Sequence, residues 1–94
     1  MDRITKEMVC RKFSVFCLAL GVDAFFDEEW DRNRSGLFLD MSYRNRYVVR
    51  HYTPHGSILT PFGLKHRTAA EMWDVLDFAT EAVELNAKCT IHTL

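Results

Sequence analysis

The side chains of this sequence that could do chemistry gather in its middle, where arginines are interleaved with tyrosines. Guanidinium groups suit phosphates and aromatic rings on a sheet suit stacked bases, so this composition favours nucleic-acid binding as one function. The bases that would make the contacts are Arg44, Arg46, Arg50, Lys65 and Arg67. Residues 32–67 hold seven Lys and Arg against one Asp, whereas both flanks are acidic. The bases therefore have a second interpretation, as ion-pair partners of the chain's own carboxylates.

The other reactive side chains form no recognisable motif. Cys10, Cys17 and Cys89 have no C-x-x-C spacing, and His51 and His55 lie around a Pro-Gly turn, so no metal site is expected. The sequence contains no nucleophile elbow, phosphate-binding loop or oxyanion turn. We therefore expect no enzyme: no catalytic residue, no cofactor and no small-molecule substrate.

Length and composition favour one globular domain over residues 1–94. The chain is 48% hydrophobic and 27% charged, close to the globular average. An odd number of cysteines without framework spacing favours a reducing compartment, so we expect a cytoplasmic protein. The apolar run from Phe13 to Val22 is too short to span a bilayer, and Asp2 and Glu7 do not suit the start of a signal peptide. We expect no membrane partner.

Helical periodicity predicts two helices. Apolar residues recur at the spacing of one helical face from Thr5 to Leu20, and Gly21 is placed to end that helix. Thr68 and Glu71 have the spacing of a capping box, which predicts a second helix from there to about Asn86.

The second helix is apolar on two sides. One side, with Met72 and Leu76, should cover the sheet. The other side includes Phe78 and Leu85, which either the first helix or a second subunit must cover. Phe78 and Leu85 are therefore candidate contacts to a protein partner or to a second copy of the chain.

Residues 23–31 combine five acids with Phe25, Phe26 and Trp30 and show no clear periodicity. We expect an irregular connection here, with at most one helical turn. Buried aromatic rings carry much of the energy of protein interfaces, so these three are candidate anchors for a protein partner. The alternative is that they close the open end of the core while the acids keep the loop in water.

Alternation of apolar and polar residues predicts strands at 37–43, 47–52 and 57–60. A three-residue loop from Arg44 to Arg46 would pair Leu39 with His51, which keeps large apolar groups opposite each other.

These elements predict an α+β fold in the order helix, three-stranded antiparallel meander, helix. We expect both helices on the sheet face that carries Leu39 and Val49. The opposite face should then be open, and its Phe38 and Tyr52 are further candidate contacts to a partner.

The segments Tyr47–Val49, Pro61–Gly63 and Arg67–Trp73 are similar to segments of small uncharacterised proteins encoded by bacteriophages and prophages. The resemblance covers residues 47–85 at most, and its motifs are a turn, a cap and a packing helix. It implies a phage-type accessory protein and brings no catalytic residue.

The sequence therefore predicts a small non-enzymatic binding or regulatory module that contacts a host protein, a phage protein or itself. The alternative is a nucleic-acid-binding domain that uses the basic β-hairpin. The element order resembles that of double-stranded-RNA-binding domains, but their second helix begins with lysines, whereas this one exposes acids.

Overall fold

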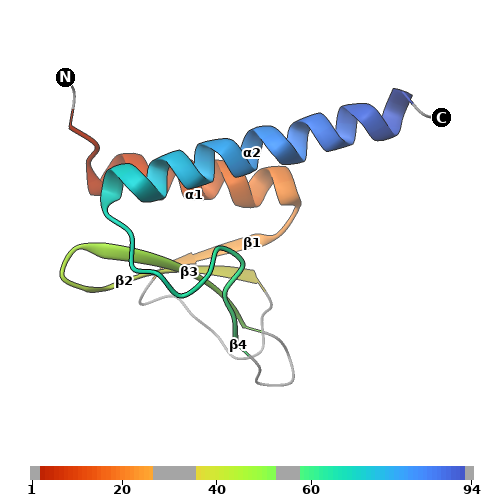
Figure 1. The fold of residues 1–94 in the computed structure, drawn as a ribbon. Helices are drawn as coiled ribbons and strands as arrows, with labels where there is room; N and C mark the ends of the chain where they lie inside the picture. Colours follow the sequence, from red (N-terminus) through yellow and green to blue (C-terminus); the bar gives the residue numbers. More distant parts are fainter. Residues whose placement is uncertain (1–2, 27–35, 53–57, 93–94) are drawn as a thin grey trace.

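The computed structural model describes residues 3–26, 36–52 and 58–92 (Figure 1). In these residues the chain forms two α-helices and a four-stranded sheet, which is an α+β fold. The helices are α1 (Lys6–Leu20) and α2 (Ala69–His92), and the strands are β1 (Asp23–Phe26), β2 (Gly36–Tyr43), β3 (Arg46–Tyr52) and β4 (Ile58–Leu59).

The described strands lie in the order β1-β2-β3-β4. Neighbours β2, β3 and β4 are antiparallel, as the sequence predicted, but β1 is parallel to β2, so the sheet is mixed. The expected irregular connection is wrong for residues 23–26, which pair with residues 36–39. Phe26 packs edge-on against Phe13 of α1 with ring centroids 5.8 Å apart, so this short strand joins the core. Residues 27–31 lie outside the described part of the chain.

Both helices lie on one face of the sheet and run side by side in the same direction (Figure 1). Thr5 caps α1, because its Oγ1 accepts from the N–H of Met8 at 3.3 Å. At the other end Gly21 adopts φ 75°, the left-handed conformation that glycine tolerates, and ends the helix as predicted. The core between the layers is formed by Val9, Phe13, Phe16, Cys17, Leu37, Leu39, Tyr47, Val49, Met72 and Leu76.

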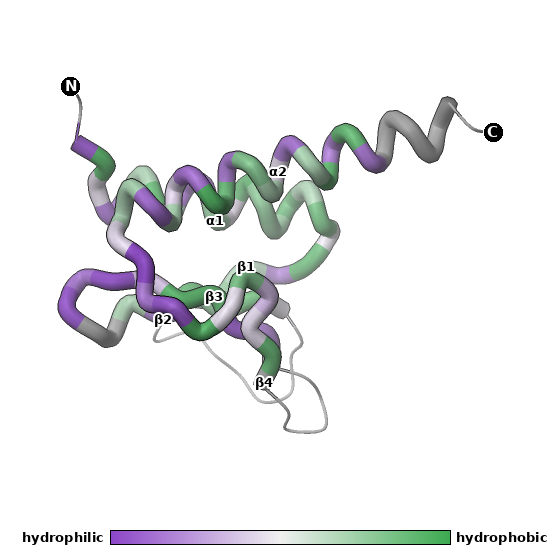
Figure 2. Tube along the Cα trace, in the orientation of Figure 1, coloured by the Kyte–Doolittle hydropathy of each residue, from purple (hydrophilic) through white to green (hydrophobic). Residues whose placement is uncertain are grey.

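Figure 2 shows the same division in hydropathy: apolar residues recur along both helices and the central strands, whereas the β2–β3 turn and the segment before α2 are hydrophilic.

The β2–β3 hairpin differs from its prediction. Its turn has two residues, Arg44 and Asn45, with φ of 45° and 58°, because a turn with two positive φ angles matches the twist of the strands. Tyr43 pairs with Arg46, and an irregularity in β2 between Asp40 and Tyr43 then shifts the register by one residue. Leu39 therefore pairs with Val49 rather than with His51.

The predicted open face of the sheet is not open at its large apolar residues. Phe38 retains 8% and Val48 1% of their accessible surface. On the same face Arg50 Nε donates to Asp40 Oδ2 at 3.0 Å, so two charged groups satisfy each other there. Strand residues that are apolar in succession, such as 37–39, are typical of a sheet covered on both sides. The side chain of Tyr52 lies outside the described part of the structure.

Gly36 is fixed by the close approach of β1. A Cβ added at this position would lie 2.5 Å from the carbonyl oxygen of Asp23 and 2.6 Å from Cε2 of Phe25. The substitution Gly36→Ala should therefore push β1 away from β2 and lower the free energy of unfolding by about 1–3 kcal/mol. Urea unfolding followed by circular dichroism measures the loss, and hydrogen exchange should accelerate at the β1 amides. An unchanged unfolding midpoint would contradict the parallel β1–β2 pairing.

Candidate functional site

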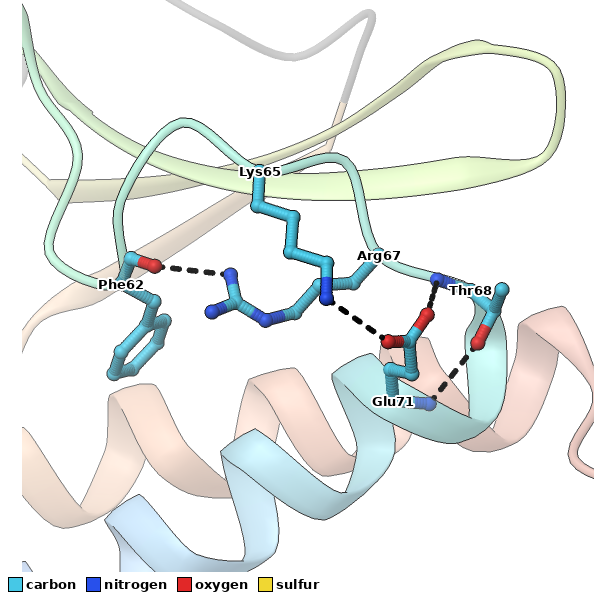
Figure 3. A network of polar contacts seen from close by, with 5 residues as sticks. All are labelled: Phe62, Lys65, Arg67, Thr68 and Glu71. Carbon is cyan, nitrogen blue, oxygen red and sulfur yellow. Dashed lines mark hydrogen bonds and ion pairs between the residues drawn. The ribbon is translucent and has the colours of Figure 1, made fainter.

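Three of the five basic residues that were predicted to contact nucleic acid are hydrogen-bonded within the fold. Arg50 is held by Asp40 on the second face of the sheet. Arg67 is half-buried, and its Nη1 donates to the carbonyl oxygen of Phe62 at 2.9 Å (Figure 3). Its backbone also exchanges two hydrogen bonds with Tyr47, at 2.8 and 3.0 Å. The guanidinium groups of Arg50 and Arg67 are therefore hydrogen-bonded within the chain.

Lys65 is hydrogen-bonded as well, at the start of α2 (Figure 3). The N–H of Thr68 donates to Glu71 Oε1 at 3.1 Å, and the N–H of Glu71 donates to Thr68 Oγ1 at 3.2 Å, which confirms the predicted capping box. Lys65 Nζ lies 3.3 Å from Glu71 Oε2. The backbone hydrogen bond from Thr68 is the largest of the effects that lower the pKa of Glu71 to about 2, followed by the Thr68 side chain and Lys65.

Arg44 of the hairpin turn and Arg46, the first residue of β3, are exposed. Tyr47 follows Arg46 in the sequence, and its side chain is buried with 4% of its surface accessible. Burial is the main cause that raises the pKa of Tyr47. Tyr47 therefore cannot stack on a base without leaving the core. The side chains of Tyr43 and Tyr52 lie outside the described structure.

Of the two thiols whose side chains the structure describes, Cys17 is the more deeply buried. Cys17 is buried, and burial raises its pKa to about 12, so it is a neutral packing group rather than a nucleophile. No three His, Cys, Asp or Glu side chains among the described residues are grouped so as to hold a metal ion. His55 and the side chain of Cys89 lie outside those residues.

A cavity of about 890 Å³ lies where both helices begin beside the β2–β3 hairpin. Its charged lining residues are Arg3 and Lys6, and its lining includes no Cys, His, Asp or Glu. The lining also holds Tyr47 and Thr68, so its polar groups are an ammonium, a guanidinium, an amide and hydroxyls rather than carboxylates or imidazoles.

Helix α1 covers only one flank of α2. Lys12 of α1 lies 4.4 Å from the ring centroid of Trp73 and 2.5 Å from Asp77 Oδ1, so these two residues mark the side of α2 that faces α1. Met72 and Leu76 point into the core and are fully buried. In the described part of the helix, α1 therefore leaves the side away from the sheet uncovered.

That side carries a line of four exposed residues, which we call the outer stripe: Asp74, Phe78, Glu81 and Leu85. The exposed fractions of Phe78 and Leu85 are 74% and 62%. Their spacing of four, three and four residues places all four on one side of the helix. The sequence analysis predicted that either the first helix or a second subunit covers Phe78 and Leu85. The structure shows that α1 does not cover them.

The other predicted partner contacts lie elsewhere. Phe25 and Phe38 are buried, and Phe26 is partly buried against the core. Trp30 lies outside the described residues. Sequence reasoning did not single out Leu18 and Leu64, although their exposed fractions are 81% and 73%. Helical periodicity places Leu18 away from the buried side of α1, so its exposure could have been predicted from the sequence.

No family model, curated protein or solved structure matches the chain. Among the described residues, no helix has both the length and the apolar character needed to cross a membrane.

The capping box makes stability depend on pH through Glu71. The lowered pKa means that ionised Glu71 stabilises the fold above about pH 4.5, and that this contribution is lost as the pH falls towards 2. Glu71→Gln should therefore flatten the fall in unfolding free energy between pH 4.5 and 2. Lys65→Met is the matched comparison: it should keep most of the fall, because the Thr68 amide is the larger cause. Chemical unfolding at a series of pH values tests both, and equal curves for wild type and Glu71→Gln would contradict the capping role.

Proposed function

We propose that this chain is a small non-enzymatic binding module that recognises a protein partner through the outer stripe of α2. The supporting observation is the exposure of Phe78 and Leu85, seven residues apart on the side of α2 that neither the sheet nor α1 covers. Scattered exposed apolar residues are normal on protein surfaces. Two large ones in line on a helix match the anchors of helix-mediated recognition.

The energy available from these two anchors bounds the interface. Burying a Phe or Leu side chain contributes about 1.5–3 kcal/mol, whereas a micromolar complex needs about 8 kcal/mol. Phe78 and Leu85 alone therefore do not account for a micromolar complex. The partner must also contact the residues between and beside them, including Asp74 and Glu81.

The biological setting we propose is that of a phage or prophage accessory protein in the cytoplasm, which regulates a host or phage protein by occupying its surface. This setting follows from the resemblance of residues 47–85 to small phage proteins. A second copy of the chain is the other occupant that the sequence suggested.

Selection from a displayed peptide library on the full chain tests the proposed function. Selected peptides should bind wild type, lose at least tenfold in affinity for Phe78→Ser and Leu85→Ser, and bind Leu64→Ser as well as wild type. Leu64 is the matched control, because its exposed fraction of 73% equals that of Phe78 within one percentage point and it lies before α2.

Because Phe78 and Leu85 are exposed, both serine variants should keep the unfolding free energy of the wild type within about 0.5 kcal/mol. Peptides whose binding is the same for wild type and Phe78→Ser would contradict recognition through the outer stripe. Dimerisation of the wild type that Phe78→Ser abolishes would identify a second copy as the occupant.

Nucleic-acid binding is the second candidate function, and the exposure of Arg44 and Arg46 at the hairpin turn favours it. Arg50 and Arg67 are part-buried and hydrogen-bonded within the fold. Arg44 and Arg46 are exposed, and together they would supply about two phosphate contacts. Two contacts give a slope of log K against log salt near −2.

A gel shift with single- and double-stranded DNA and RNA tests this second candidate. If the hairpin binds, affinity should fall with the shallow slope of about −2, and Arg44→Ala with Arg46→Ala should abolish the shift. Arg11→Ala, an exposed arginine on α1, is the matched control and should leave it intact. A slope steeper than −4, or binding that survives loss of both hairpin arginines, would contradict this mode.

A further inference from the structure

We infer that the partner docked on the outer stripe is a basic amphipathic helix, an inference that rests on the proposed function. The described side chains of α2, from Ala69 to Asn86, include five charged residues, and all five are acidic. Two of them are neutralised within the chain: Glu71 by Lys65, and Asp77 by Lys12.

The other three carboxylates, Asp74, Glu81 and Glu84, are exposed and have no hydrogen bond or ion pair within the described part of the chain. Asp74 and Glu81 alternate with Phe78 and Leu85 in the outer stripe, and Glu84 lies beside it. Among the described side chains, this surface therefore combines apolar anchors with negative charge that no cation balances. Its complement is an apolar surface edged by Lys or Arg.

The shape of the surface indicates that the complement is a helix. The outer stripe runs over twelve residues, from Asp74 to Leu85, or about 16 Å along a straight helix. Its spacing of four and three residues matches anchors at i, i+3, i+4 and i+7 on a partner helix. α2 also continues past the end of α1 (Figure 1).

The same charges disfavour the alternative occupants. Nucleic acids and anionic lipid surfaces carry the same sign as Asp74, Glu81 and Glu84. Two copies paired stripe to stripe would bring carboxylates into one interface, and like charges across an interface are repulsive. A basic partner is the occupant that neutralises this surface rather than adding to its charge.

The test uses two synthetic peptides with the same apolar helical repeat over about 18 residues, one edged by Lys and Arg and the other by Glu. Fluorescence anisotropy with the full chain measures both affinities. We expect the basic peptide to bind at least tenfold more tightly than the acidic one, because each exposed ion pair contributes a few-fold. This preference should shrink as salt is raised from 0.05 to 0.5 M.

Variants separate the two sources of binding. The triple substitution Asp74→Asn, Glu81→Gln and Glu84→Gln should reduce the preference for the basic peptide to less than threefold. Glu7→Gln, which neutralises an exposed carboxylate of α1, is the matched control and should leave the preference intact. Phe78→Ser should abolish binding of the basic peptide.

Failure of the inference is distinguishable from failure of the proposed function. Equal binding of both peptides that still depends on Phe78 would overturn the basic partner and leave the recognition surface standing. The basic partner is overturned in the same way if neither peptide binds while library-selected peptides bind through Phe78. If binding of the basic peptide survives Phe78→Ser unchanged, both the inference and the recognition surface are wrong.

Discussion

The structure depends on one packing constraint: two helices share one face of a narrow sheet, and both begin at the same end of it. Phe13 of α1 and Met72 and Leu76 of α2 are fully buried there together with Leu39 of the sheet. α1 has 15 residues and α2 has 24, so α2 continues beyond its neighbour (Figure 1). The helices can bury one side each, and the outer side of α2 is left to water or to a partner.

Local sequence signals were sufficient for the elements that local interactions define. The end of α1 at Gly21 and the start of α2 at Thr68 were predicted because each depends on hydrogen bonds within a few residues. β1 was missed because four residues carry too little alternation to identify a strand. Its pairing with β2 is set by tertiary contacts, including Phe26 against Phe13.

The site was predictable in part. Helical periodicity identified Phe78 and Leu85 as part of a second apolar side of the helix. Which neighbour covers them depends on how the two helices pack, and the sequence of one helix does not determine that packing. For the arginines, the sequence did not show which of them the fold would engage. Their number suggested a phosphate-binding surface, whereas Arg50 and Arg67 are satisfied by partners 10 and 5 residues away in the chain. The predicted open sheet face was wrong because Phe38 and Val48 are buried.

Recognition through the outer stripe requires that Phe78 is exposed in the isolated chain. Fluorine NMR on the chain with fluorinated phenylalanine at all seven Phe positions, with a soluble paramagnetic agent added, measures this exposure at concentrations where the chain is monomeric. Phe78 should broaden most and Phe13, which is fully buried, least. Protection of Phe78 equal to that of Phe13 in the monomer would show that the chain covers its own outer stripe, and would contradict the account.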